Sequence, residues 1–240
     1  MRLRGGGTRR VELSAEALAG IDGFRDLNHK DRAAVARHGT VEQHPNNHLI
    51  LSHRDQGSDV FMIISGQVRA THYSRNGKEV TFRELGAGEL FGELSAIDGK
   101  PRSAHVVTLA DSTIGRMSAE VFWTVLRGHP DFAELMLEKL TSQVRLLSDR
   151  VVEFSTLGVK NRIHTELLRL AREQEPSDNR ADISPVPTHA YIASRVSTHR
   201  EAVTRELNGL IQSGLLEKKK RTLTVTDLLR LTKMVEDVSN

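Results

Sequence analysis

Short apolar runs separated by turn residues fill residues 48–118, and their spacing restricts the fold of that segment more than any other feature. The runs are residues 60–64, 67–71, 80–82 and 106–109. Asn76-Gly77 lies between the second and third runs and favours a hairpin, because both residues tolerate positive φ. Strands at this spacing predict an antiparallel sandwich, roll or barrel.

A long helix is predicted after these strands. Pro130 suits a first helical turn, where its missing N–H is harmless, and we expect the helix over residues 131–154. Its apolar positions recur at alternating intervals of three and four residues, which is a heptad pattern. These positions form the seam: Leu137, Leu140, Val144, Leu147, Val151 and Phe154. A lone amphipathic helix would pack on its own domain, but a stripe this narrow favours a dimeric coiled coil.

The C-terminal part begins with a predicted helix over residues 160–173, followed by a polar, proline-rich loop or linker over residues 176–187. Thr188 then suits the N-cap of another helix, in which Ile192 and Val196 share one face. These features predict the first half of a helix-turn-helix.

The second helix of this motif carries its polar side chains on one face. Ser197-Thr198 is expected to end the first helix and cap the second. The buried positions would be Val203, Leu207 and Leu210, which leaves Arg200, Glu201 and Arg205 on the outer face. Arginine binds guanine bidentately and glutamate accepts from cytosine, so this face suits the major groove of DNA.

A basic hairpin is predicted after the second helix. Leu215-Leu216 starts one strand, residues 222–225 form the other, and the turn between them is Lys218, Lys219, Lys220 and Arg221. Residues 188–221 contain seven Lys or Arg and three Asp or Glu, a net charge of +4. A solvated lysine run on a helix hairpin is the plain alternative, but a helix-turn-helix with a basic wing favours contacts to DNA phosphates.

Residues 91–104 contain a possible anion site. Gly92 precedes a short predicted helix, whose backbone N–H groups could face an anion. Arg102 could pair with a phosphate, Ser103 could donate from its hydroxyl, and Glu93 could accept from a sugar hydroxyl. The alternative is an ordinary loop with a surface ion pair between Glu93 and Arg102.

This segment resembles the phosphate-binding cassette of cyclic-nucleotide-binding domains. The order of strands, long helix and winged helix resembles the CRP/FNR regulators over nearly residues 24–230, most closely the branch of the cyclic-AMP receptor protein. The resemblance implies that Gly92, Glu93, Leu94, Arg102 and Ser103 hold the cyclic phosphate and ribose. It also implies that Arg200, Glu201 and Arg205 contact bases in a two-fold symmetric site, with half-sites similar to TGTGA.

The residues expected at the nucleotide base depart from that branch. A Thr-Ser pair on the long helix there contacts adenine, the serine coming from the partner subunit. Ser148 matches the serine, but Leu147 occupies the threonine position, and Gln143 replaces an arginine. Leucine cannot bond the adenine amino group, whereas Ser148 can both donate and accept. We therefore expect cyclic AMP to bind and cyclic GMP to bind within about tenfold of it.

Composition excludes several other functions. The chain has 240 residues, a net charge of +3 and no cysteine, which rules out disulfides and cysteine-ligated iron–sulfur or zinc sites. No apolar run reaches the ~18 residues that span a bilayer. We find no catalytic constellation and no metal-ligand spacing, so we expect a protein that is not an enzyme and has no catalytic cofactor. We also expect it to be cytoplasmic and not to bind a membrane.

The expected architecture is α+β in four parts. A basic flexible tail covers residues 1–20, and an N-terminal antiparallel β-roll, the cyclic-nucleotide-binding domain, covers 21–128. A dimerisation helix with its hinge follows over 129–157, and a C-terminal winged helix-turn-helix covers 158–240. The expected partners are double-stranded DNA, a cyclic nucleotide, a second copy of the chain and, as a candidate, RNA polymerase. The alternatives are a related regulator with another ligand or none, and a nucleotide-binding regulatory subunit of a partner enzyme.

Overall fold

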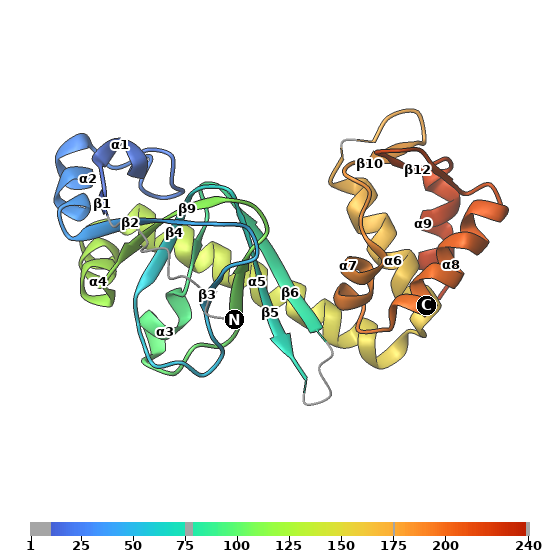
Figure 1. The fold of residues 1–240 in the computed structure, drawn as a ribbon, viewed down its shortest axis with the longest axis horizontal. Coiled ribbons are helices and arrows are strands. Elements are labelled where there is room, and N and C mark those ends of the chain that lie inside the picture. Colours follow the sequence, from blue (N-terminus) through green and yellow to red (C-terminus); the bar gives the residue numbers. More distant parts are fainter. Residues whose placement is uncertain (1–10, 75–78, 175, 239–240) are drawn as a thin grey trace, which may run out of the picture. The chain divides into compact units, whose positions relative to one another are not determined.

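The structure is a computed structural model that describes residues 11–74, 79–174 and 176–238 (Figure 1). The chain divides into two compact units, residues 1–72 with 81–141 and residues 73–80 with 142–240. Among the described residues, no helix is both long enough and apolar enough to span a membrane.

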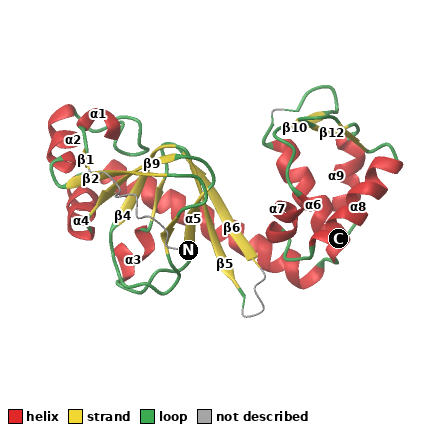
Figure 2. Cartoon of the chain, in the orientation of Figure 1, coloured by secondary structure: helices red, strands yellow, loops and turns green. Residues whose placement is uncertain are grey.

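The N-terminal unit is built on two antiparallel sheets, with strand orders β1-β2-β9-β4-β7 and β3-β8-β5-β6 (Figure 2). The strands are β1 (Val11–Glu12), β2 (Gly39–His44), β3 (Leu49–Leu51), β4 (Val60–Ser65), β5 (Gln67–Tyr73), β6 (Glu79–Gly86), β7 (Leu90–Phe91), β8 (His105–Thr108) and β9 (Ser112–Met117). The four apolar runs of the sequence fall in β4, β5, β6 and β8, so the predicted antiparallel fold is confirmed. The predicted Asn76-Gly77 turn lies outside the described residues.

The interior of this roll is filled by side chains from both sheets. Alternate residues of a strand point to opposite faces, so each strand contributes one apolar face. The buried cluster consists of Ile63, Val68, Leu85, Phe91, Val106 and Ile114. Three of these residues come from each sheet, and their packing joins the two sheets into one domain.

Helices cover one end of the roll through a second buried cluster. They are α1 (Ala15–Leu18), α2 (His29–Ala36), α4 (Ala119–Gly128) and the first part of α5 (Pro130–Thr156). The rings of Phe24 and Phe132 meet edge to face, with centroids 4.9 Å apart. Lys139 Nζ lies 3.0 Å from Asp22 Oδ2, which also fastens α5 to the segment after α1.

Residues 11–20 were expected to belong to a flexible tail, but they fold with the N-terminal unit. Strand β1 pairs with β2, and Ser14 Oγ caps α1 by accepting from the backbone N–H of Ala17. Leu13 and Leu18 are buried. The segment is too short to show a periodicity of its own, and its apolar side chains are held by partners from later in the chain.

The C-terminal unit combines helices with a three-stranded sheet of order β10-β12-β11. Its elements after α5 are α6 (Val159–Arg172), β10 (Ala181–Ile183), α7 (His189–Arg195), α8 (Arg200–Gln212), β11 (Leu216–Lys218), β12 (Leu223–Val225) and α9 (Leu228–Glu236). The predicted helices and the hairpin are confirmed, with the first helix beginning one residue earlier than expected.

The predicted loop over residues 176–187 contains a strand instead. In β10, Ala181 and Ile183 are buried and Asp182 is exposed, and the strand pairs with β12. Thr224 Oγ1 donates to Asp182 Oδ1 at 2.6 Å. Alternation over three residues beside several prolines is too short to predict a strand from sequence. The pairing with β12, from the distant hairpin, defines it.

Candidate nucleotide-binding and DNA-binding sites

The cassette segment is formed by β7, the short helix α3 (Glu93–Asp98) and the loop after it. Gly92 connects the strand to the helix with φ of 83°, a left-handed conformation that favours glycine. A Cβ at this position would lie 2.9 Å from both Arg102 Nη1 and the carbonyl oxygen of Asp59. Glycine is therefore required here both by the backbone conformation and by the close approach of its neighbours.

Arg102 is buried beside this glycine, with only 4% of its surface exposed. Nη1 donates to the carbonyl oxygen of Gly92 and Nη2 to that of Asp59, each at 2.9 Å. Burial lowers the pKa of the guanidinium, while the charge of Asp59 opposes this shift. The two bonds use two of the five guanidinium hydrogens. A fixed cation with donors to spare is suited to hold a phosphate.

The backbone around Arg102 is also fixed. Its N–H donates to the carbonyl oxygen of Asp55 at 3.0 Å, and its own carbonyl oxygen accepts from Arg54 at 2.9 Å. One residue later, the carbonyl oxygen of Ser103 accepts from His53 Nδ1 at 3.1 Å. A carbonyl can only accept, so the hydrogen of this bond must be on the histidine. Residues 53–55 thus support the cassette loop.

Glu93 begins α3 and is 8% exposed. Burial raises its pKa, against the lowering effects of the backbone hydrogen bond and of Arg83, Lys139 and Arg102. Within the described part of the chain, Glu93 and Arg102 form no ion pair, and both are buried, so the surface-pair alternative is wrong. A buried carboxylate facing cations suits the role of a hydroxyl acceptor.

The other predicted nucleotide residues differ in their placement. Leu94 is half-buried on α3 and Ser103 is exposed at the end of the loop, so both lie with the cassette in the N-terminal unit. Leu147 and Ser148 lie on α5 in the C-terminal unit and are exposed. Ser148 Oγ donates to the carbonyl oxygen of Val144 at 2.9 Å. The oxygen can still accept from another group.

The seam on α5 is largely uncovered. Leu137, Val144 and Val151 are each more than 60% exposed, Leu147 is 39% and Phe154 is 36% exposed, and Leu140 is half-buried. Exposed apolar side chains arranged at heptad spacing along one helix are typical of a contact surface.

The helix-turn-helix is formed by α7 and α8. Thr188 Oγ1 caps α7 by accepting from the backbone N–H of Tyr191 at 3.1 Å, as predicted. The N-cap of α8 is His199, however, and not Thr198. Ser197 has φ of 51°, and the N–H of Thr198 still donates to the carbonyl oxygen of Ala193 at 2.9 Å. Thr198 therefore completes the turn after α7, and α8 begins one residue later than expected.

The two faces of α8 are as predicted. Val203, Leu207 and Leu210 are buried in the domain core together with Ile192, Ala193 and Val196 of the preceding segment. Arg200, Glu201 and Arg205 are exposed. The outer face is thus free to contact a partner.

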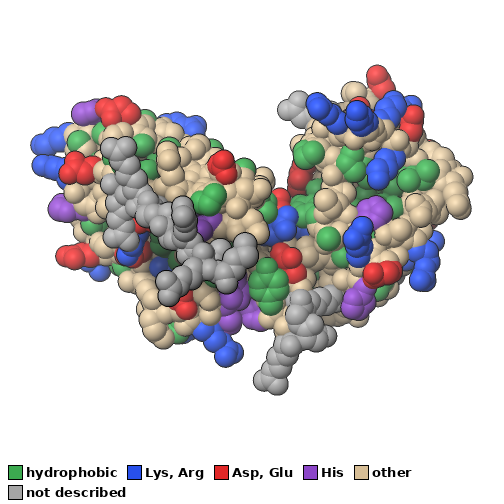
Figure 3. Space-filling model, in the orientation of Figure 1, with side chains coloured by type: hydrophobic (Ala, Val, Ile, Leu, Met, Phe, Trp, Pro, Cys, Tyr) green, Lys and Arg blue, Asp and Glu red, His purple; other side chains and the backbone are tan. Residues whose placement is uncertain are grey.

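The wing is the hairpin of β11 and β12. Lys218 was expected in the turn but is the last residue of β11, where it pairs with Leu223. Lys218, Lys219, Lys220 and Arg221 are all exposed, and the N–H of Lys219 donates to the carbonyl oxygen of Thr222 at 2.8 Å. Blue Lys and Arg side chains are spread over the visible face of the C-terminal unit in Figure 3. The exposed cationic residues of the wing are suited to bind a polyanion.

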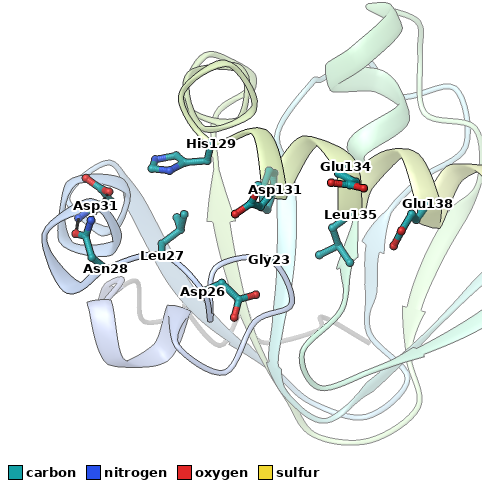
Figure 4. Close-up of a pocket in the computed structure, with 11 residues that line it drawn as sticks. Gly23, Asp26, Leu27, Asn28, Asp31, His129, Asp131, Glu134, Leu135 and Glu138 are labelled. Atoms are coloured by element: carbon teal, nitrogen blue, oxygen red, sulfur yellow. Dashed lines mark hydrogen bonds between the residues drawn. The ribbon is translucent and has the colours of Figure 1, made fainter.

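A cavity of about 360 Å³ lies elsewhere in the N-terminal unit, between α2, the segment before it and the start of α5 (Figure 4). Its acidic lining residues are Asp26, Asp31, Asp131, Glu134 and Glu138. Such a lining repels phosphate. Across residues 11–74, 79–174 and 176–238, no group of three or more His, Cys, Asp or Glu is arranged to hold a metal ion.

Sequence reasoning missed the groups that hold Arg102, namely the carbonyl oxygens of Gly92 and Asp59 and the backbone of residues 53–55. Every residue type has a backbone carbonyl, so the sequence does not indicate which carbonyl oxygens accept these hydrogen bonds. A turn signal that could have pointed to this loop is Gly57, between residue 55 and Asp59.

Comparison with known proteins identifies two domain families in the chain. Residues 41–129 match the family described as cyclic nucleotide-binding domain, and residues 161–234 match the Crp-like helix-turn-helix domain. The chain belongs to the CRP/FNR family of transcription regulators. It is a cyclic-nucleotide-binding, DNA-binding regulator, and the family is not one of enzymes.

Relatives cover most of the chain. The CRP-like cAMP-activated global transcriptional regulator of Mycobacterium tuberculosis is 24% identical over 90% of this chain and 96% of its own length. The cyclic AMP receptor protein of Thermus thermophilus is 28% identical, over 77% of this chain and 82% of that protein. A structure of a CooA variant from Carboxydothermus hydrogenoformans covers 95% of this chain and 98% of its own, with a TM-score of 0.76 and 19% identity. The last likeness confirms the α+β fold.

Proposed function

We propose that this regulator is a homodimer that binds cyclic AMP and, when it is bound, recognises a palindromic DNA site. The observation that carries the proposal is the buried Arg102, fixed against Gly92 with donors to spare. Within the described residues, this desolvated cation donates to two carbonyl oxygens, which are neutral, so it gains most from an anion. The cAMP-activated relatives support cyclic AMP as that anion.

In this proposal the cassette residues Gly92, Glu93, Leu94, Arg102 and Ser103 hold the sugar and the phosphate. Arg102 and the first N–H groups of α3 would bind the cyclic phosphate, and Glu93 would accept from the ribose 2′-hydroxyl. Leu147 and Ser148 would lie near the base. Because Ser148 can donate or accept, cyclic GMP would bind as well.

On the DNA side, Arg200, Glu201 and Arg205 would contact base edges in the major groove. The Thr188 end of α7 and the wing residues 218–221 would contact phosphates. The seam would form the dimer interface, and two copies of α8 would then meet half-sites about one helical turn apart. Nucleotide binding would act by population shift at the hinge near residues 154–158. A DNA-binding regulator would work in the cytoplasm, with RNA polymerase as a candidate partner.

The test is a mobility-shift assay with a pool of random duplexes, with and without cyclic AMP or cyclic GMP, followed by calorimetry. Arg102→Leu should abolish nucleotide binding and leave the fold intact, because a lost buried charge pair weakens binding by several kcal/mol. The matched control is Lys100→Leu, which removes an exposed cation two residues away. Binding of duplexes without any nucleotide effect would indicate another ligand or none, and wild-type nucleotide affinity of Arg102→Leu would refute the site.

A further inference from the structure

His189 lies among the cationic residues of the DNA-binding domain, at the first position of α7. Its Nδ1 is 2.7 Å from Thr204 Oγ1, on the helix that carries Arg200 and Arg205. The ring is half-buried.

The hydrogen bonds of Thr204 define which ring nitrogen of His189 can titrate. The hydroxyl of Thr204 donates its one hydrogen to the carbonyl oxygen of Arg200 at 3.0 Å. With its hydrogen assigned to that bond, Thr204 accepts from His189, and we assign the hydrogen of the neutral ring to Nδ1. Nε2 is then the bare nitrogen, and a proton added there leaves the bond to Thr204 intact.

The charges around the ring oppose that proton in the free protein. Burial and the charges of Lys218 on β11 and Arg200 on α8 lower the pKa of His189. Among the described residues no carboxylate contributes to this shift, and the first turn of α7 contains no acidic residue. Lys218 and Arg200 are both residues that we assign to DNA.

We propose that His189 is a further DNA-binding residue of this chain, and that each protomer takes up a proton at Nε2 of His189 when a duplex phosphate binds beside it. This inference rests on the proposed DNA-binding function. A phosphate would neutralise the field of Lys218 and Arg200 and would accept directly from the protonated ring, since imidazolium donates from both nitrogens. His189 would act as a neutral residue in the free protein and as a third cation in the complex.

The sign of the pH dependence follows from linkage. The complex would have the higher pKa at His189 and therefore bind more protons than the free protein, so affinity rises as the pH falls. The rise is confined to the range between the low pKa of the free protein and the raised pKa of the complex. One proton per protomer limits it to about tenfold in affinity per pH unit per protomer.

The experiment measures duplex affinity of the nucleotide-bound full chain between pH 5.5 and 8.5 at constant ionic strength, with a site selected from the random pool. Calorimetry in buffers of different ionisation enthalpy gives the protons taken up. Wild type should bind more tightly at low pH and take up protons. His189→Gln keeps a donor for Thr204 but cannot be charged, so its pH dependence should be reduced by up to one proton per protomer. His189→Arg should bind tightly at pH 8.5 with a similarly reduced dependence.

The matched control is His38→Gln, an exposed histidine of the N-terminal unit, which should keep the wild-type pH profile. Equal proton uptake by wild type and His189→Gln would overturn the inference, and so would tight wild-type binding with no proton uptake. In both cases the proposed function would stand. Absence of duplex binding at every pH would instead refute the proposed function and the inference together.

Discussion

Gly92 and Gly99 lie at the two ends of α3, and both have positive φ. Replacing each by alanine therefore distinguishes the cost of backbone strain from the cost of a steric clash in the cassette. Gly92 precedes α3 with φ of 83°, and Gly99 ends it with φ of 68°. A Cβ on Gly99 would meet nothing within 4 Å, whereas a Cβ on Gly92 would press on Arg102 and on the backbone of Asp59. Both Gly92→Ala and Gly99→Ala therefore force alanine into a left-handed backbone conformation, but only Gly92→Ala adds a steric clash of the new Cβ.

The expected magnitudes follow from these contacts. Left-handed backbone costs alanine about 1–2 kcal/mol, which is the whole expected effect of Gly99→Ala. Gly92→Ala also has to displace the Arg102 side chain or the Asp59 backbone. This breaks at least one guanidinium hydrogen bond, worth about 1.5–3 kcal/mol. We expect Gly92→Ala to destabilise the N-terminal unit by about 2.5–5 kcal/mol and to lose nucleotide binding, and Gly99→Ala to retain nucleotide binding.

Trp123 provides the assay. It is the only tryptophan of the chain, and its Nε1 donates to the carbonyl oxygen of Ala96 on α3 at 2.9 Å. Its fluorescence during urea unfolding therefore reports on the unit that contains the cassette, and calorimetry with cyclic AMP reports binding. Equal free energies of unfolding for the two variants, or unchanged nucleotide affinity of Gly92→Ala, would refute this account of Gly92.

Four further outcomes are expected. Val144→Asp places a charge in the exposed seam and should convert a dimer to monomers in sedimentation, and an unchanged dimer would disprove the seam. Replacing Arg200 or Arg205 by alanine should weaken duplex binding by about 1–3 kcal/mol and relax the preference at one base pair, whereas equal weakening on every sequence would indicate phosphate contacts. Cyclic GMP should bind within about tenfold of cyclic AMP, or ~1.4 kcal/mol, because Leu147 offers no hydrogen bond to adenine; a hundredfold preference in calorimetry would contradict this. His105 Nδ1 accepts the backbone N–H of residue 53 at 3.2 Å, and burial, with neighbouring histidines, lowers its pKa, so the unit should lose stability as the pH falls below about 6.5. His105→Asn retains a hydrogen-bond acceptor but does not titrate. Its urea unfolding midpoint, followed by Trp123 fluorescence, should therefore depend less on pH than that of the wild type.

Much of the fold was predictable because its signals are local. The strand runs, the heptad seam and the capped helix at Thr188 each depend on residues within a few positions of one another. The same holds for Gly92, since a glycine between a strand and a helix marks a backbone turn wherever the rest of the chain lies. Strand β10 was missed because three residues have too little periodicity to stand out from their prolines.

The environment of the cassette could not be predicted in this way, because its determinants are distant in sequence and lie on the main chain. The acceptor for Arg102 Nη2 comes from 43 residues earlier, and the support of Ser103 comes from 50 residues earlier. Which carbonyl meets a guanidinium depends on the register of β4 with β7 and β9, which brings the residue before Val60 next to Gly92. Side chains such as Arg102 and Glu93 identify the chemistry of a site from sequence. The geometry that makes Arg102 a fixed, desolvated cation comes from the sheet.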